Sequence, residues 1–185
     1  MTRGNGERAS VGEEERPGVR AHRALWRHWG TPAAIYGTVV YSSLIAAASV
    51  ESAGHQSAIR ILLFALITVV VFWLAHIFAD ALAYHGDRDR RHVTLKDSLG
   101  HAVFDSSGML EAAVVPSIPL VLSVFGLMPV EAAIMTALWL AVAMLALLGY
   151  LAFAVRDHRV WARVVGSAVT ALFGVSVVVL EAALH

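Results

Sequence analysis

The chain contains no cysteine, so it has no disulfide bond, no thiolate metal ligand and no cysteine nucleophile. Charged residues are scarce as well, at 15% of the sequence, whereas soluble domains carry roughly 25%. A glycine-rich phosphate loop, a nucleophile elbow and a zinc-protease motif are all missing. These absences exclude a disulfide-stabilised fold and leave no enzyme signature, so we expect neither an enzymatic activity nor a cofactor.

Long apolar runs dominate the chain instead. Hydrophobic residues make up 58% of the 185 residues, and the mean hydropathy is +0.67. Five runs are long enough to cross a hydrocarbon layer about 30 Å thick. They predict an all-α membrane protein, a bundle of five transmembrane helices at residues 33–50, 58–80, 109–127, 132–153 and 164–184. We therefore expect a multi-pass protein of the cell membrane whose first partner is the lipid bilayer.

The remaining segments are polar. Residues 1–30 predict a disordered basic cytoplasmic tail, in which Arg20, Arg23 and Arg27 recur at helical spacing beside tryptophans. Arginine next to tryptophan at the edge of a membrane span favours lipid headgroups over nucleic acid as the ligand of this tail. Residues 94–106 predict a short interfacial helix, and the region 31–185 forms the five-helix domain. Two prolines, Pro116 and Pro119, predict an irregular third span.

The basic residues define an orientation. With five spans, the N-terminal tail and the loops after the second and fourth spans share one side of the membrane. All of the 14 lysines and arginines except Arg60 fall on that side. Because cytoplasmic loops are enriched in lysine and arginine, the N-terminus is predicted inside and the C-terminus outside.

Small residues predict where the helices pack. Thr38 and Ser42 lie one turn apart in the first span, and Gly166, Thr170 and Gly174 do so in the fifth. Small side chains at this spacing let helix backbones approach closely in lipid. We expect the Gly166–Gly174 face to join two copies of the chain or a membrane-protein partner.

The strongest chemical signal lies near the end of the second span. His76 and Asp80 are four residues apart and so share one helix face. Ionisable side chains within a span usually serve a function, and histidine changes its charge near neutral pH. The pair, with Glu111 at the start of the third span, is therefore a candidate proton- or cation-binding site.

A structural interpretation of His76, Asp80 and Glu111 remains possible. Asp80 can mark the end of its helix, Glu111 can interact favourably with the dipole at the N-terminus of its helix, and His76 can hydrogen-bond Thr38 or Tyr41.

A metal centre would draw on six residues: His76, Asp80, His85, His101, Asp105 and Glu111. Their spacing fits no ligand motif, so we expect no metal. Tyr36, Tyr41 and the tryptophans are mostly interpreted as interface anchors and packing residues, with the deeper Trp73 and Trp139 assigned to the core.

Two motifs carry a resemblance. IYGTVV at Ile35–Val40 and VFWLAH at Val71–His76 are similar to those of small multi-span integral membrane proteins of bacteria. This resemblance implies the membrane fold and brings no activity. The layout is also similar to that of vacuolar-type iron transporters, but the acidic residues of their first span are missing here.

Two classes of function remain: a small proton or cation translocator that uses His76 and Asp80, and a non-catalytic membrane scaffold or accessory subunit.

Overall fold

The computed structural model describes residues 32–51, 57–85, 95–154 and 160–184. These residues form five α-helices, each long and apolar enough to cross a membrane: α2 (Pro32–Glu51), α3 (Ala58–His85), α4 (Leu95–Val124), α5 (Val130–Ala154) and α6 (Val160–Leu184). The predicted all-α bundle of five membrane-spanning helices is confirmed, and the chain is a multi-pass membrane protein. The predicted tail at residues 1–30 lies outside the described residues.

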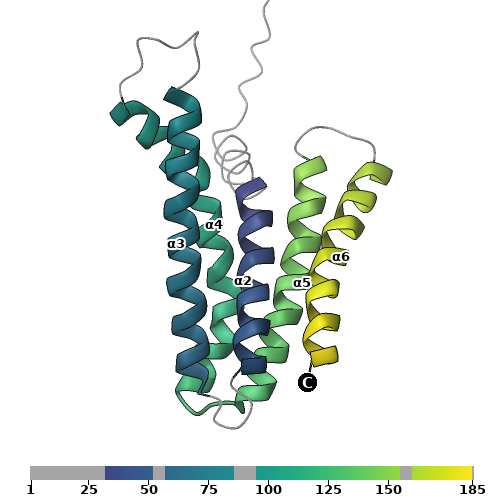
Figure 1. The fold of residues 1–185 in the computed structure, drawn as a ribbon. Helices are drawn as coiled ribbons and strands as arrows, with labels where there is room; N and C mark the ends of the chain where they lie inside the picture. Colours follow the sequence, from purple (N-terminus) through teal and green to yellow (C-terminus); the bar gives the residue numbers. More distant parts are fainter. Residues whose placement is uncertain (1–31, 52–56, 86–94, 155–159, 185) are drawn as a thin grey trace, which may run out of the picture.

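Consecutive helices run in opposite directions (Figure 1). Pro32 of α2, the start of α4 and the start of α6 therefore lie at one end of the bundle, which we name the N-terminal end. The α3 and α5 helices finish at this end. Among the described basic residues, Lys96 and Arg163 lie at the first turns of α4 and α6, whereas Arg60 lies at the opposite end.

The α2 helix is the centre of the bundle. It packs against each of the other four helices, with α3 and α4 on one side and α5 and α6 on the other (Figure 1). Thr38, Ser42 and Ser49 are buried on it, and their hydroxyls donate to carbonyl oxygens of the same helix at 2.7–3.0 Å. These small side chains satisfy their own hydrogen bonds, so they allow close packing without needing a polar partner.

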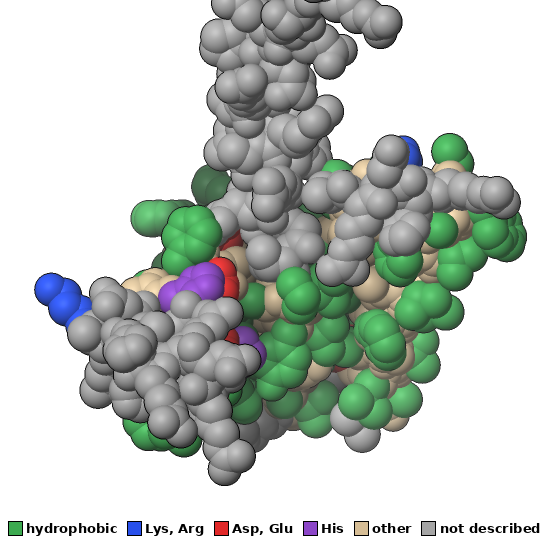
Figure 2. All heavy atoms as spheres, turned by 90° about the horizontal axis from the view of Figure 1, so that it is seen from above, with side chains coloured by type: hydrophobic (Ala, Val, Ile, Leu, Met, Phe, Trp, Pro, Cys, Tyr) green, Lys and Arg blue, Asp and Glu red, His purple; other side chains and the backbone are tan. Residues whose placement is uncertain are grey.

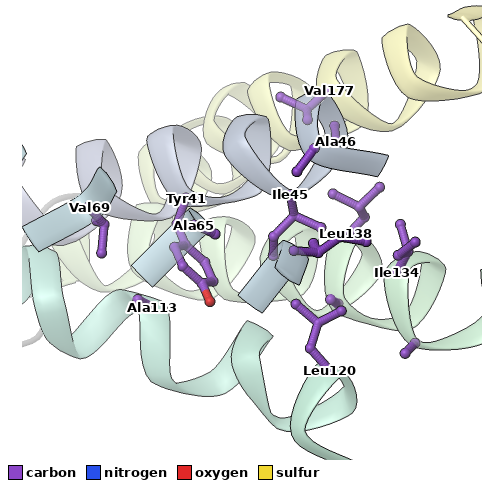
Figure 3. Packing of buried hydrophobic residues seen from close by; sticks show 14 of the residues in the cluster. Tyr41, Ile45, Ala46, Ala65, Val69, Ala113, Leu120, Ile134, Leu138 and Val177 are labelled. Atoms are coloured by element: carbon purple, nitrogen blue, oxygen red, sulfur yellow. The ribbon is translucent and has the colours of Figure 1, made fainter. Parts of the chain in front are cut away.

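The core at the middle of the bundle is aliphatic around one tyrosine. Ile45, Leu120 and Leu138 are buried side by side from α2, α4 and α5 (Figure 3). Tyr41 is fully buried and reaches from α2 towards α4, where its hydroxyl forms a short hydrogen bond with that of Ser117. Of the two predicted roles, Tyr41 is therefore a packing residue and not an interface anchor, because a partner on α4 satisfies its hydroxyl within the core.

The α5 and α6 helices pack through glycines. A Cβ added to Gly149 would come within 2.6 Å of the Gly166 carbonyl oxygen, and one added to Gly174 within 3.0 Å of the Val142 Cα. Thr170 donates from its hydroxyl to the Leu145 carbonyl at 2.8 Å. The Gly166–Gly174 face is thus covered by α5 of the same chain. The predicted helix packing at this face occurs within the chain, and the association of two copies or of a membrane-protein partner stays a prediction.

The Thr170 hydrogen bond provides a test of this packing. We expect Thr170→Val to lower the free energy of unfolding by about 0.6 kcal/mol, the mean for interhelical hydrogen bonds in membranes. Thr136→Val is the matched control, because the exposed Thr136 hydroxyl donates only within α5, to the Ala132 carbonyl at 2.7 Å. The measurement is thermal unfolding in detergent micelles. Equal destabilisation by both variants would contradict an interhelical role for Thr170.

The first half of α4 corrects a second expectation. Residues 95–124 form a single helix, and the predicted separate interfacial helix at 94–106 is continuous with the third span. The first turns of α4 lean away from the axis of the rest of the helix (Figure 1). Pro116 and Pro119 lie inside α4 without ending it, as membrane helices tolerate when neighbouring groups surround the freed carbonyls. Gly126, with a φ of 73°, then turns the chain into α5.

Large apolar side chains cover the outside of the bundle. Trp139 on α5 is 56% exposed, so its assignment to the core is wrong. The exposed faces of α3 and α6 carry further apolar residues: Leu63, Ile67, Phe78, Leu172 and Phe173. Hydropathy alone does not separate lipid-facing from buried positions, because both kinds of position are apolar in a membrane protein.

Candidate functional site at the N-terminal end

The predicted pair forms on α3. His76 Nε2 and Asp80 Oδ2 are 3.4 Å apart, and the two side chains are 39% and 43% exposed. His76 and Asp80 lie roughly 14 Å and 8 Å along the axis from the last residue of α3, at about 1.5 Å per residue. Asp80 therefore lies near the N-terminal end of the bundle, whereas His76 lies only about 7 Å from the midpoint of α3.

Two further helices complete the site. Ser106, buried on α4, donates its hydroxyl to Asp80 Oδ2 at a long 3.4 Å. Tyr36 on α2 stacks against His76, with ring centroids 6.3 Å apart and an angle of 20° between the rings. The site thus joins α2, α3 and α4. Sequence reasoning missed Ser106 and Tyr36, because contacts across helices depend on how each helix is rotated about its axis.

The predicted hydrogen bond from His76 to the first span does not form. Thr38 donates to the Ala34 carbonyl at 2.8 Å, and Tyr41 pairs with Ser117. Both hydroxyls therefore have other partners. His76 contacts α2 through the ring of Tyr36 instead, so the interpretation of His76 as a donor to Thr38 or Tyr41 is wrong.

Apolar packing supports the site from one side. Ile77, Ala81 and Ala102 form a small buried cluster between α3 and α4, and Trp73 packs against it. The Trp73 indole Nε1 is buried and has no hydrogen-bond partner among the described residues. Histidine and acidic side chains lie beside each other at this end of the molecule, next to hydrophobic ones (Figure 2). Ala81, next to Asp80 in sequence, belongs to this cluster, and the Asp80 side chain itself is 43% exposed.

A second pair of the same kind lies on α4. His101 Nδ1 and Asp105 Oδ2 are 3.4 Å apart, also four residues apart in sequence, with side chains 50% and 58% exposed. Glu111, the third predicted site residue, is half-buried on α4. It lies about 140° around the helix from Ser106, at 100° per residue. The structure therefore does not place Glu111 on the α4 face that meets Asp80.

The donor set limits the chemistry. Among the described residues, no three histidine or acidic side chains come close enough to hold a metal ion; the side chain of His85 is outside them. An imidazole, a carboxylate and a hydroxyl can accept and release a proton, or bind a cation that keeps part of its water shell. In comparisons with known proteins, the chain matches no protein-family model, no curated protein and no solved structure.

Proposed function

We propose that the protein is a small proton or cation translocator that binds its cargo at His76 and Asp80. The observation that carries the proposal is the pair itself, an imidazole and a carboxylate 3.4 Å apart within a membrane-spanning helix. A carboxylate costs about 2.5–3.5 kcal/mol to insert at the centre of a span and less towards its ends, and ionisable residues within a span usually serve a function. We propose no enzymatic activity for this protein.

Each neighbour has a defined part in this function. Asp80 lies closer to the N-terminal end and receives the proton or cation from water, and His76 lies about one turn deeper. Ser106 holds one carboxylate oxygen of Asp80 by donating a hydrogen bond. Tyr36 stacks on the imidazole and limits its rotation. The cargo would therefore pass from Asp80 to His76, in the direction of the bundle's interior.

One observation favours the alternative, a membrane scaffold or accessory subunit without transport. Aliphatic side chains fill the middle of the bundle between the site and the opposite end. The Tyr41–Ser117 pair lies among them. The two hydroxyls are hydrogen-bonded to each other, and that of Ser117 also donates to the Ala113 carbonyl. A cargo that left His76 would therefore need this core to open, whereas a scaffold would not.

Flux into liposomes tests the proposal. The purified chain, reconstituted into vesicles with an imposed proton or cation gradient, is expected to dissipate the gradient faster than protein-free vesicles. His76→Ala is expected to remove this excess flux, because it removes the imidazole that lies 3.4 Å from the Asp80 carboxylate. His101→Ala is the matched control, since His101 has the same spacing to its aspartate on α4.

The outcomes separate the two functions. Wild-type flux equal to that of protein-free vesicles, for protons and for several cations, would overturn the translocator and favour the scaffold. Loss of flux in both histidine variants would show that the effect does not depend on the site on α3. Thermal unfolding of each variant, measured in parallel, identifies any loss that comes from misfolding.

A further inference from the structure

A buried acid lies on α6, at the end of the bundle opposite the His76–Asp80 site. Glu181 is in the last turn of α6, which finishes at that end (Figure 1). Its side chain is 4% exposed, and it is the only buried acidic or basic side chain among the described residues. Because burying a carboxylate in an apolar environment is costly, ionisable side chains inside a membrane bundle usually serve a function.

The packing of α6 shows which helices Glu181 faces. Val177 and Val178 belong to the central core, together with residues of α2 and α5, and Val177 lies beside Ala46 of α2 (Figure 3). Glu181 follows these valines by one turn and so shares their helix face. Ser49 follows Ala46 by one turn on α2 and is also buried. Since α2 and α6 run in the same direction, Ser49 and Glu181 lie at the same level of the bundle.

The charged residues of the neighbouring helices at this end are mainly acidic. The α2 helix ends at Glu51, and α5 carries the exposed Glu131 in its first turn. Arg60 is exposed on α3, which packs against α2 and α4. The last turn of a helix also disfavours a negative charge, because the negative end of the helix dipole lies there. Burial and the helix dipole therefore both favour a Glu181 carboxylate that holds a proton or a cation.

Glu181 and His76 are near water on different sides of the membrane. Glu181 lies about 5 Å along the axis from the end of α6. His76 lies about 27 Å from the start of α3, which is at the same end of the bundle as Glu181. The two residues are therefore roughly 20 Å apart along the bundle. A translocator needs binding groups from which its cargo can leave, and several weak sites in series serve this purpose.

We propose that Glu181 is a second cargo-binding residue, at which the proton or cation enters or leaves on the side opposite Asp80. This inference rests on the proposed transport function, and it adds a site on α6 to the one on α3. The Glu181 carboxylate binds the cargo directly. Transfer between the two sites requires the aliphatic core to open, as the translocator itself does.

Flux into liposomes with substitutions at Glu181 tests the second site. Glu181→Gln keeps the size of the side chain and an oxygen that accepts hydrogen bonds but removes the charge. It is expected to reduce the excess flux about a hundredfold or more, as for the loss of a group that transfers protons. Glu181→Asp returns a carboxylate and is expected to recover part of the flux. Glu131→Gln is the matched control, because Glu131 is an exposed acid at the same end.

The outcomes separate this inference from the proposed function. Wild-type flux no higher than that of protein-free vesicles would overturn both. Flux that is lost in His76→Ala but kept in Glu181→Gln would overturn the second site alone. Equal losses in Glu181→Gln and Glu131→Gln would also overturn it, because the effect would then be a general one of acidic residues at this end. Thermal unfolding is measured in parallel, and a loss of both flux and stability in Glu181→Gln and Glu181→Asp would assign Glu181 to the fold and overturn the inference.

Discussion

Gly37→Ala is expected to lower the free energy of unfolding by about 3 kcal/mol, the upper end of the usual range for overpacking a core. A Cβ at this position would lie 2.7 Å from both the Cα and the carbonyl oxygen of Met109. Atoms of the backbone cannot move aside as a flexible side chain does, so α2 and α4 must separate. Because α2 packs on all four other helices, the separation weakens the whole bundle.

The same substitution is expected to disturb the candidate site. Tyr36 precedes Gly37 on α2, and Ser106 lies one turn before Met109 on α4. When the two helices separate at Gly37, Tyr36 moves away from His76. We therefore expect Gly37→Ala to reduce flux as well as stability, whereas a purely local clash would change stability alone.

Gly100→Ala is the control for this prediction. Nothing lies within 4 Å of a Cβ added at Gly100, which is also in a helix. Both substitutions gain about 1 kcal/mol of helix propensity, so the difference between them isolates the clash with Met109. Thermal unfolding in micelles measures both variants. A Gly37→Ala variant as stable as Gly100→Ala would contradict the close contact of α2 and α4.

Asp80→Asn is expected to reduce flux about a hundredfold or more, the lower end of the range for removing a group that transfers protons. Asparagine keeps the shape of aspartate, and its amide oxygen still accepts the hydrogen bond from Ser106. The change removes the negative charge, so the side chain can no longer take up a proton or balance a cation. We expect the fold to be retained, with little change in the unfolding temperature.

The positions of the helices could be predicted from the sequence because each depends on a local run of apolar residues. The runs at 33–50 and 58–80 correspond to α2 and α3, and the pairing of His76 with Asp80 follows from helix geometry alone. The prediction that one helix ends at residue 106 and the next begins at residue 109 is wrong, since α4 is continuous there. Polar residues near a span do not show whether the helix stops or only bends.

The partners across helices could not be predicted. Ser106 meets Asp80, and Tyr36 meets His76, through the rotation of α2 and α4 about their axes. In a soluble protein the apolar stripe of a helix reveals that rotation. In this chain the lipid-facing and buried sides are both apolar, as the exposed Trp139 and the buried Leu138 show, so the pattern carries little information about which side packs.

The assignment of transport to the His76–Asp80 pair is best tested by flux into liposomes. Proton and cation flux is compared between the wild type, Asp80→Asn and Asp105→Asn at equal protein content. Asp105 forms the same kind of pair with His101, and its side chain is 58% exposed. We expect the wild type and Asp105→Asn to dissipate the imposed gradient at equal rates, and Asp80→Asn to do so no faster than protein-free vesicles. A folded Asp80→Asn variant with wild-type flux would contradict the assignment of transport to the His76–Asp80 pair.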